Sequence, residues 1–512
     1  TIIYLESARS ERLSISPCVF VLPDFEKDID EDYLFELAKC GYFAVAADFS
    51  GKKEGKNGFT VYPSEVEYAN YEIVKNSLYE ISDDVKHSAW YEWGSVAKYV
   101  VNYLSSRSVV TGVGAIGVGL GASVLWEIAA NENNLACAVF LFDAGWNAYF
   151  KKGNKKSDGV SPEFNDDDLK FLAGVDAQAY ASSVKIPTLV ISATNSVSFD
   201  FDRAADTVQR MNKAQYAAID YSVNRVSVLD ASAHKDISYF LSEILLKGKK
   251  AENMPSLPEI ECYTEDGEIE IEIDAAEEGL KKVVLYAAEG DEVQQLRSWK
   301  IAGEIFADEY CDGQFVFRYL PYQNSGICSF FVRAVYESGF TVASPVATKK
   351  FAPTDVKTSH KSKLIYSGRE KFSASAFAPC FEKVKIFESE GTDVTEVKGP
   401  MDIVGLKATC GLITFKVNSE KDKPADDSIF VLDVCADEGA DITFSLLTGN
   451  DFKGMEFSAK ISCPSARSWR NFTLPLAKFK SAEGMGIKGF DEVTAIKITA
   501  DKPFLINNFL WI

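Results

Sequence analysis

The residues that could do chemistry begin with a glycine-rich turn. Residues 116–123 read IGVGLGAS between an apolar run and an apolar-periodic segment, which predicts a strand, a sharp turn and a helix. A turn of the form Gly-x-Ser-x-Gly in that setting presents a nucleophilic serine for acyl transfer. Here Gly117 and Gly121 keep the flanking glycines, but Gly119 stands where the serine would be and supplies no nucleophilic atom. Ser123 comes four residues later, inside the predicted helix, and we expect it to point away from the turn.

Acyl transfer also needs a base and an acid that orients the base. His234, in VLDASAHKDISYF, is of a type that can act as the base, and Asp143, after AVFLF, and Asp200, in SFDFD, are of a type that can act as the acid; only the family resemblance given after the domain organisation implies these roles. The backbone N–H of Leu120, next to Gly119, would point to the position where an oxyanion forms. A structural explanation stays open for each side chain: His234 as a hydrogen-bonded remnant, and Asp143 as a strand-end residue that caps a loop.

The composition restricts the partners that we expect. A chain of 512 residues is too long for one core and suggests about three domains. The net charge of −21 argues against nucleic acid and anionic membranes, which are bound by clusters of lysine and arginine. No apolar run approaches the roughly 20 residues that span a bilayer, so we expect no membrane insertion.

The ten cysteines and three histidines form no metal-binding pattern. No CxxC pair occurs, and several cysteines lie in strand-like apolar runs such as FVLDVCADEG, where a free thiol acts as a small hydrophobic group. We therefore expect mostly free thiols, no metal site and no cofactor.

The pattern of apolar and polar residues divides the chain into three segments. Residues 1–250 alternate apolar runs with amphipathic helices, which predicts a doubly wound α/β domain with a parallel sheet. After a polar linker at 247–260, residues 251–352 and 353–512 each show alternating strands, which predicts two antiparallel β-sandwiches. The strand candidates of the first domain are SPCVFVLPD, GYFAVAADFS, VVTGVGAIGVG, ACAVFLFDAG, IPTLVISAT and NRVSVLD.

Most of residues 1–250 resembles α/β-hydrolases of the dienelactone hydrolase and acetyl xylan esterase type. CVFVLPDFEKD stands where that family has a strand and an oxyanion loop, with the loop altered at Pro23 and Asp24. LAKCGYFAVAADFSGK is similar to the passage that follows in the family. IGVGLGAS occupies the nucleophile elbow, with Gly119 in place of serine or cysteine, so the resemblance implies a degenerate elbow.

The other two members of the implied triad differ from each other. IPTLVISATNSVSFD resembles the strand before the catalytic acid, but the expected acidic position reads Asn195 or Ser196. VLDASAHKDISYFLSEIL resembles the histidine loop and the helix after it, which places His234 at the catalytic position. The resemblance thus implies one retained triad member of three.

The two β-rich segments have resemblances of their own. The segment ending FFVRAVYESGFTVASPV resembles immunoglobulin or fibronectin-III spacers, and fold analogy alone gives it no ligand. The last segment, with SARSWRNFTLPLAKFKS, resembles jelly-roll carbohydrate-binding modules, in which we expect Trp469 and Trp511 to be core residues.

We therefore expect a bacterial multi-domain protein whose hydrolase domain has lost its nucleophile. The main prediction is a non-catalytic binding or scaffolding protein of glycan metabolism, with carbohydrate or an acylated glycan as its partner. The alternative is a carboxylesterase or acetyl esterase in which His234 activates water, assisted by Asp143 or Asp200. A third reading is a purely structural interaction module. The carbohydrate-binding resemblance favours an extracellular or cell-surface location, whereas the free cysteines favour the inside of the cell.

Overall fold

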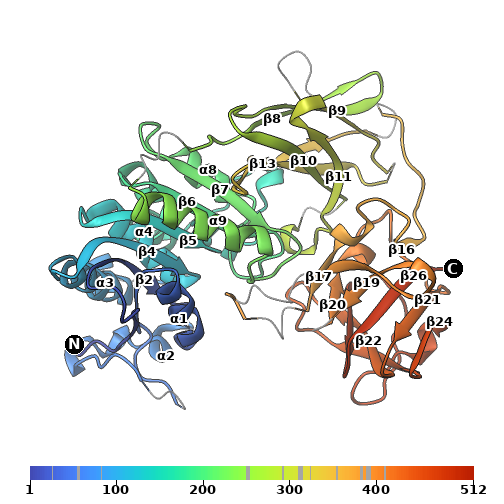
Figure 1. Cartoon of the computed structure of the whole chain (residues 1–512), viewed down its shortest axis with the longest axis horizontal. Helices are drawn as coiled ribbons and strands as arrows, with labels where there is room; N and C mark the ends of the chain where they lie inside the picture. Colours follow the sequence, from blue (N-terminus) through green and yellow to red (C-terminus); the bar gives the residue numbers. More distant parts are fainter. Residues whose placement is uncertain are drawn as a thin grey trace. The chain divides into compact units, whose positions relative to one another are not determined.

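The computed structural model describes most of the chain, which forms two compact units (Figure 1). The first unit comprises Thr1–Ser192, Ser198–Asp220 and Lys235–Leu257, and the second comprises Ala193–Val197, Tyr221–His234 and Pro258–Ile512. The predicted domain boundary at 250/251 lies outside the described residues, as does residue 353 at the start of the last predicted domain, so both boundaries stay predictions. The residues outside the description are 26, 55–57, 82–83, 249–253, 291–292, 310–314, 323, 353–355, 381–384, 388–393 and 409–410.

A seven-stranded sheet organises the first half of the chain, in the order β1-β3-β2-β4-β5-β6-β7. Neighbours from β3 to β6 pair in parallel, and only the edge strand β1 is shown pairing antiparallel, with β3. Every residue of β2 and β6 is buried, as expected for strands covered on both faces. The strands are β1 Leu5–Ala8, β2 Ser16–Leu22, β3 Phe43–Ala47, β4 Val110–Val118, β5 Leu135–Leu141, β6 Thr188–Ala193 and β7 Ala217–Ser222.

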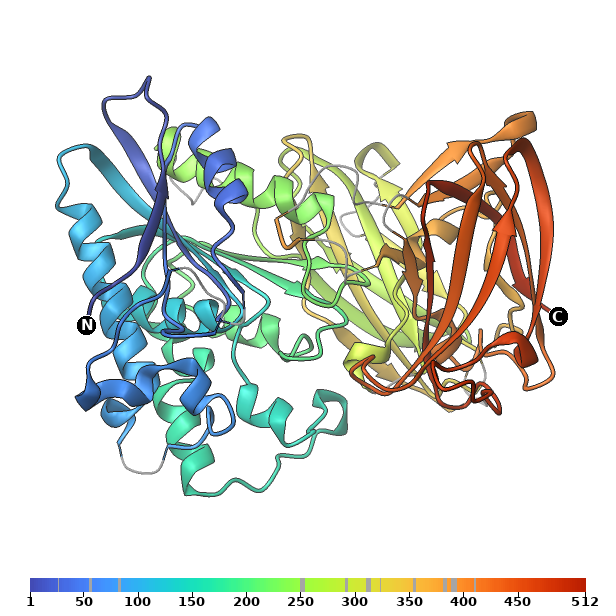
Figure 2. The ribbon, with the colours of Figure 1, turned by 90° about the horizontal axis from the view of Figure 1, so that it is seen from below.

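Helices lie on both sides of this sheet (Figure 2). A side chain on Gly114 would meet Leu245, in the helical segment Ser242–Leu246 directly after α9, whereas one on Gly117 would meet Ala122. Residues an odd number of positions apart on a strand face opposite sides, so these two contacts mark the two covered faces. The helices are α1 Glu31–Lys39, α2 Tyr71–Val74, α3 Ala89–Ser105, α4 Leu120–Asn131, α5 Asn147–Lys151, α6 Asp166–Gly174, α7 Ala177–Tyr180, α8 Ala204–Gln209 and α9 Ala231–Leu241.

One predicted strand of the first domain is wrong. Residues 224–230 (NRVSVLD) form no strand, and the last strand of the sheet is β7, seven residues earlier in the chain. Val226 packs instead in a cluster with Leu296, Ile413 and Phe415 in the second unit. The alternating pattern therefore marks side chains that are buried from an irregular segment, not from a strand.

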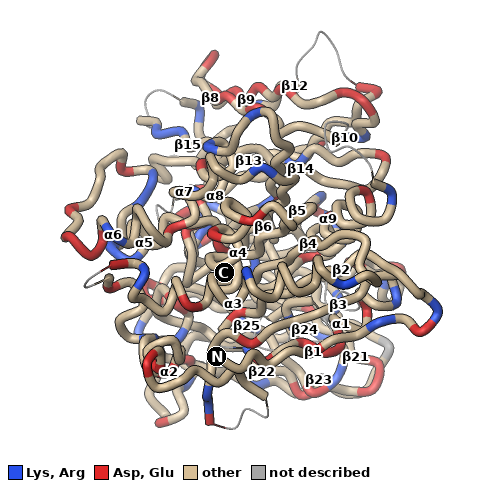
Figure 3. Tube along the Cα trace, turned by 90° about the vertical axis from the view of Figure 1, so that its left-hand side faces the viewer, with Lys and Arg blue, Asp and Glu red and all other residues tan. Residues whose placement is uncertain are grey.

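The second unit is built from antiparallel sheets, as predicted. In its first part the sheets have the orders β11-β10-β13-β14 (with β15 on β13) and β12-β9-β8. The alternating isoleucines of β9 are buried, and Figure 3 shows acidic residues along β8 and β9. The strands are β8 Glu259–Glu265, β9 Glu268–Asp274, β10 Leu280–Glu289, β11 Lys300–Phe306, β12 Phe315–Tyr319, β13 Ile327–Tyr336, β14 Thr341–Ala343 and β15 Ala347–Lys350.

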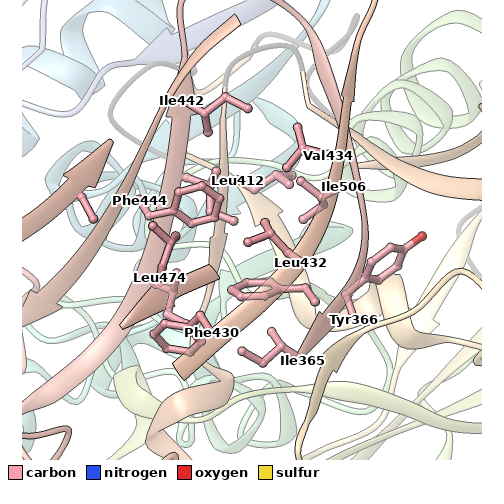
Figure 4. Packing of buried hydrophobic residues seen from close by; sticks show 14 of the residues in the cluster. Ile365, Tyr366, Leu412, Phe430, Leu432, Val434, Ile442, Phe444, Leu474 and Ile506 are labelled. Carbon is pink, nitrogen blue, oxygen red and sulfur yellow. The ribbon is translucent and has the colours of Figure 1, made fainter. Parts of the chain in front are cut away.

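The last part of the chain holds a six-stranded and a five-stranded sheet. Their orders are β18-β19-β26-β21-β24, with β16 on β26, and β17-β20-β25-β22-β23. One hydrophobic cluster takes side chains from both sheets, including Leu432, Phe444 and Ile506 (Figure 4). Trp511 is buried in this cluster, as predicted, whereas Trp469, also predicted to be a core residue, is only half-buried and lies outside the cluster. The strands are β16 Leu364–Tyr366, β17 Phe377–Pro379, β18 Thr395–Lys398, β19 Val404–Ala408, β20 Leu412–Thr414, β21 Ile429–Ala436, β22 Ala440–Thr448, β23 Glu456–Cys463, β24 Ala466–Pro475, β25 Val493–Ala500 and β26 Phe504–Trp511.

The structure also bears on the predicted thiols and on the predicted lack of a membrane-spanning segment. Eight of the cysteines are described, and all eight are free thiols; Cys311 and Cys410 lie outside the description. Among the helices of the described part of the chain, none has both the length and the hydropathy that a bilayer-spanning segment needs.

Candidate functional site

The glycine-rich turn has the strand–turn–helix form that its sequence predicts. β4 ends at Val118, Gly119 has φ +53° and ψ −123°, and α4 begins at Leu120. A Cβ on Gly117 would lie 2.6 Å from the Cα of Ala122, and one on Gly121 would lie 2.4 Å from the carbonyl oxygen of Leu22. The flanking glycines are therefore required by close packing of the helix against β4 and the end of β2.

A carboxylate occupies the space beside this turn. A Cβ on Gly119 would lie 2.8 Å from Cγ and 2.9 Å from Oδ1 of Asp24, which follows β2. The N–H of Leu120 donates to Asp24 Oδ1 at 3.4 Å. In a nucleophile elbow, the N–H after the nucleophile belongs to the oxyanion hole. Asp24 thus places a negative group where a serine side chain and a developing oxyanion would have to be.

Asp143 lies in a buried polar cluster at the end of β5. It accepts hydrogen bonds from the Ser123 hydroxyl and, at 2.8 Å, from the Gly145 N–H. The Asn147 amide nitrogen is 3.3 Å from both Asp143 oxygens and 3.1 Å from Asp176 Oδ1, so it joins two buried carboxyl groups. Burial raises the pKa of Asp143, although these donors act against the shift. Ser123 points to this cluster, so it supplies no substitute nucleophile at the turn.

Asp176 is the titratable group that the sequence analysis missed. It accepts from Asn147 and from the Gln178 side-chain amide, the latter at 3.1 Å. Burial, together with the neighbouring Asp143 carboxyl, raises its pKa from 3.8 to about 7. Asp176 lies between α6 and α7, and nothing in the sequence around it distinguishes this aspartate, because its partner Asp143 comes from a separate loop after β5.

Replacing Asp176 by asparagine is expected to change how stability depends on pH. Between the unfolded value of 3.8 and the folded value of about 7, the folded protein keeps a proton that the unfolded chain has lost. The stability contributed by this group is therefore present at low pH and is lost as the pH rises towards 7. The free energy of unfolding of Asp176→Asn should rise relative to that of the native chain between about pH 4 and pH 7.

Urea denaturation at several pH values between these limits measures the difference. The exposed Asp158→Asn is the matched control, and its difference from the native chain should stay constant. A constant difference for Asp176→Asn as well would contradict the assignment.

Asp200, the second predicted acid, forms an ion pair. Its Oδ2 is 2.6 Å from Nη1 of Arg203, and both side chains are buried. The Arg203 guanidinium also donates to Asn154 and lies 4.9 Å from the ring centre of Tyr149. Burial raises the pKa of Asp200 to about 6, against the lowering effect of Arg203. This carboxylate holds the start of α8, and its use as a catalytic acid stays a prediction.

The loops after β6 and β7 belong to the second unit. Asn195, at the position where an acid was expected, donates hydrogen bonds from its side-chain amide to the backbone oxygens of Gln295 and Arg297 at 2.9 and 2.8 Å. Asn195 has a clear structural role, since it fixes its loop to the backbone before β11.

His234 lies within α9, with its backbone N–H bonded to the carbonyl of Asp230 at 3.2 Å. His234 is half-buried, and its role as a base stays a prediction.

No three histidine, cysteine, aspartate or glutamate side chains are grouped as metal ligands within the described ranges. Asp143 and Asp176 form a pair of buried carboxyl groups that the Asn147 amide bridges. The site therefore consists of the Asp24–Gly119 turn and the Asp143–Asp176 cluster in the first unit.

Comparison with known proteins places similarity in the first half of the chain. No protein-family model matches the chain, and no curated protein matches its sequence. An acetyl xylan esterase from Paenibacillus sp. R4 is 14% identical, with 47% of this chain and 79% of that chain covered and a TM-score of 0.36. Est1E from Butyrivibrio proteoclasticus, solved with ferulic acid, is 10% identical, with 48% and 94% covered and a TM-score of 0.35. A dienelactone hydrolase-like promiscuous phosphotriesterase from metagenomic libraries is 18% identical, with 48% and 97% covered and a TM-score of 0.32.

These similar structures are α/β-hydrolases, of the acetyl xylan esterase and dienelactone hydrolase-like kinds that the sequence resembles. Their printed names describe esterases and hydrolases, which agrees with the alternative prediction of an esterase better than with the main prediction of a non-catalytic protein. At this identity and TM-score the likeness concerns the fold and carries no argument about activity.

Proposed function

We propose that the chain is a non-catalytic binding or scaffolding protein that uses a hydrolase-like first half and acts in glycan metabolism. The observation that carries the proposal is the carboxylate of Asp24 at a turn whose central residue is Gly119. The contact between Asp24 and the turn supports a site that differs from a hydrolase at two positions, because an aspartate is present beside the turn in addition to the missing serine.

The physical reason lies in the charge of the transition state. Ester hydrolysis develops a negative oxygen, which a hydrolase stabilises with N–H donors aimed at that oxygen. In this chain the Leu120 N–H already donates to Asp24. A second negative oxygen at the same place would be repelled by the carboxylate, so the turn opposes the charge that acyl transfer creates. The amide of Asn195 likewise supports a loop that is kept for structure.

A second candidate is an esterase in which His234 activates a water molecule directly, assisted by Asp143 or Asp200. The observation that favours it is the place of His234 in the chain, in α9 directly after the loop that follows β7. This mechanism needs no nucleophile at residue 119. It does need a carboxylate within hydrogen-bond reach of the imidazole.

Hydrolysis of a short-chain aryl ester distinguishes the two candidates. We expect the native protein to show no turnover above that of His234→Ala at neutral pH. The exposed His87→Ala is the matched control, because surface imidazoles hydrolyse activated esters slowly without any site. Turnover that persists in His87→Ala and disappears in a folded His234→Ala protein would overturn the proposal in favour of the esterase.

A further inference from the structure

The second unit contains a cavity of about 640 Å³ that is largely open to solvent and that the hydrolase-like turn does not involve. This volume lies within the range typical of small-molecule sites. Its walls come from three parts of the unit: the segment after β7, strands β11 and β13, and residues 368–377 together with residues 394 and 396.

The floor of the cavity is cationic. Arg225 and Arg333 are both buried, and Arg333 pairs with Asp230 at 3.0 Å. Burial acts to raise the pKa of Asp230, but Arg333 and Arg225 outweigh it, and the pKa lies below its usual value. One carboxylate thus faces two guanidinium groups. The Arg333 guanidinium is further held by the carbonyl oxygen of Tyr221.

The rim adds further charges of both signs. Arg369, Glu370 and Lys371 are consecutive and exposed, and Glu396 accepts a hydrogen bond from Tyr366 at 2.9 Å. Four basic and three acidic side chains therefore line the cavity. Basic residues outnumber acidic ones here, although the chain as a whole has a net charge of −21. This balance favours a ligand that carries negative charge together with hydroxyl groups that carboxylates can bind.

An aromatic side chain in the wall is held in a rare backbone conformation. Phe372 has φ +67°, a left-handed backbone conformation that is strained for a bulky residue. Its carbonyl oxygen accepts from the Ser375 hydroxyl at 2.6 Å, at the start of a short 3-10 helix. The wall also includes Phe377 and Ile301, so the cavity offers apolar faces beside its charges. Strain at a cavity wall is typical of residues that are positioned for a ligand.

The geometry points to a binding site for a saccharide that carries a carboxylate group, of one or two sugar units. Guanidinium groups bind a carboxylate through paired hydrogen bonds, and the lining carboxylates can accept from sugar hydroxyls. The apolar face of a sugar ring would pack on Phe372. This site rests on the proposed function, because it names the saccharide class for a binding protein of glycan metabolism. It does not involve the turn at Gly119, so the aryl-ester test of the turn and the sugar titration can fail independently.

Calorimetric titration of the full chain with galacturonic acid, its dimer and galactose tests the site. We expect the acidic sugars to bind at least about tenfold more tightly than galactose, and binding to weaken as salt is raised. Inorganic phosphate is the control for charge alone. Equal binding of neutral and acidic sugars, equal competition by phosphate, or no binding of the acidic sugars at millimolar concentration would overturn the proposal.

Two variants in the cavity and one control outside it connect the binding to this cavity. Arg369→Glu reverses an exposed charge at the rim and should weaken binding of the acidic sugar about tenfold or more. Arg470→Glu makes the same change at an exposed position of β24 that does not line the cavity, and should leave binding unchanged. Phe372→Gly removes the ring and relaxes the backbone, so it should fold and bind several-fold more weakly. Equal effects of Arg369→Glu and Arg470→Glu would place the binding elsewhere on the protein.

Discussion

Replacing Gly119 by serine is expected to destabilise the protein and not to restore an esterase. A serine here would adopt φ +53°, and its Cβ would lie 2.8 Å from Cγ of Asp24. Backbone strain of this kind costs on the order of 1–3 kcal/mol, and displacing a half-buried carboxylate adds to it. We therefore expect Gly119→Ser to lower the free energy of unfolding by about 2–4 kcal/mol.

A double-mutant cycle separates the contact with Asp24 from the backbone strain. Asp24→Gly removes the carboxylate, so Gly119→Ser in that background should cost at least about 1 kcal/mol less than in the native chain. Gly153→Ser is the matched control: Gly153 has φ +66°, but a side chain there would meet nothing within 4 Å. Its cost should be strain alone and should not change with Asp24→Gly.

Denaturation of these variants and of the native protein measures the coupling. Any gain in aryl-ester hydrolysis is expected in the double variant alone, where the Leu120 N–H loses its acceptor and a hydroxyl is present. Additive costs, or hydrolysis by the single Gly119→Ser variant, would show that Asp24 does not block the turn.

The parallel sheet could be predicted because burial on both faces leaves a local signal. A continuous apolar run such as SPCVFVL is typical of a strand that is covered on both faces. The glycines at 117 and 121 indicate close packing of the helix against the strands, because any side chain at these positions would prevent it. The strand predicted at 224–230 failed for the opposite reason. Its alternation records contacts with distant residues such as Phe415, which no local pattern contains.

The chemistry of the candidate site was harder to predict than its position. The missing nucleophile is visible at residue 119, but the acceptor that replaces it is Asp24, which lies almost a hundred residues earlier in the chain. The same holds for Asp143 and Asp176, whose coupling depends on Asn147 lying between them. Asp24 and Gly119 follow β2 and β4, whereas Asp143 follows β5 and Asp176 lies between α6 and α7, so only the folded chain brings the members of each pair together.

Breaking the Asp200–Arg203 pair tests whether this carboxylate serves structure or catalysis. Arg203→Met removes the partner of a buried carboxylate 2.6 Å away, and such losses cost about 3–5 kcal/mol. Because burial already raises the pKa of Asp200 to about 6, the unpaired group should bind a proton more readily still. The loss should therefore be larger at pH 8 than at pH 5, since the proton must be given up as the pH rises.

The double variant Asp200→Leu/Arg203→Met should recover much of that loss, because a buried pair can be replaced by apolar side chains at little cost. Lys75→Met is the matched control, since Lys75 and Glu72 form a pair with the same spacing and the same 2.6 Å distance at an exposed position. Its effect should stay within about 1 kcal/mol. A large loss of stability in Arg203→Met that the double variant reverses would mean that the Asp200 carboxylate holds α8 in place. A small loss of stability, together with ester hydrolysis that depends on Asp200, would instead mean that the carboxylate is kept for catalysis.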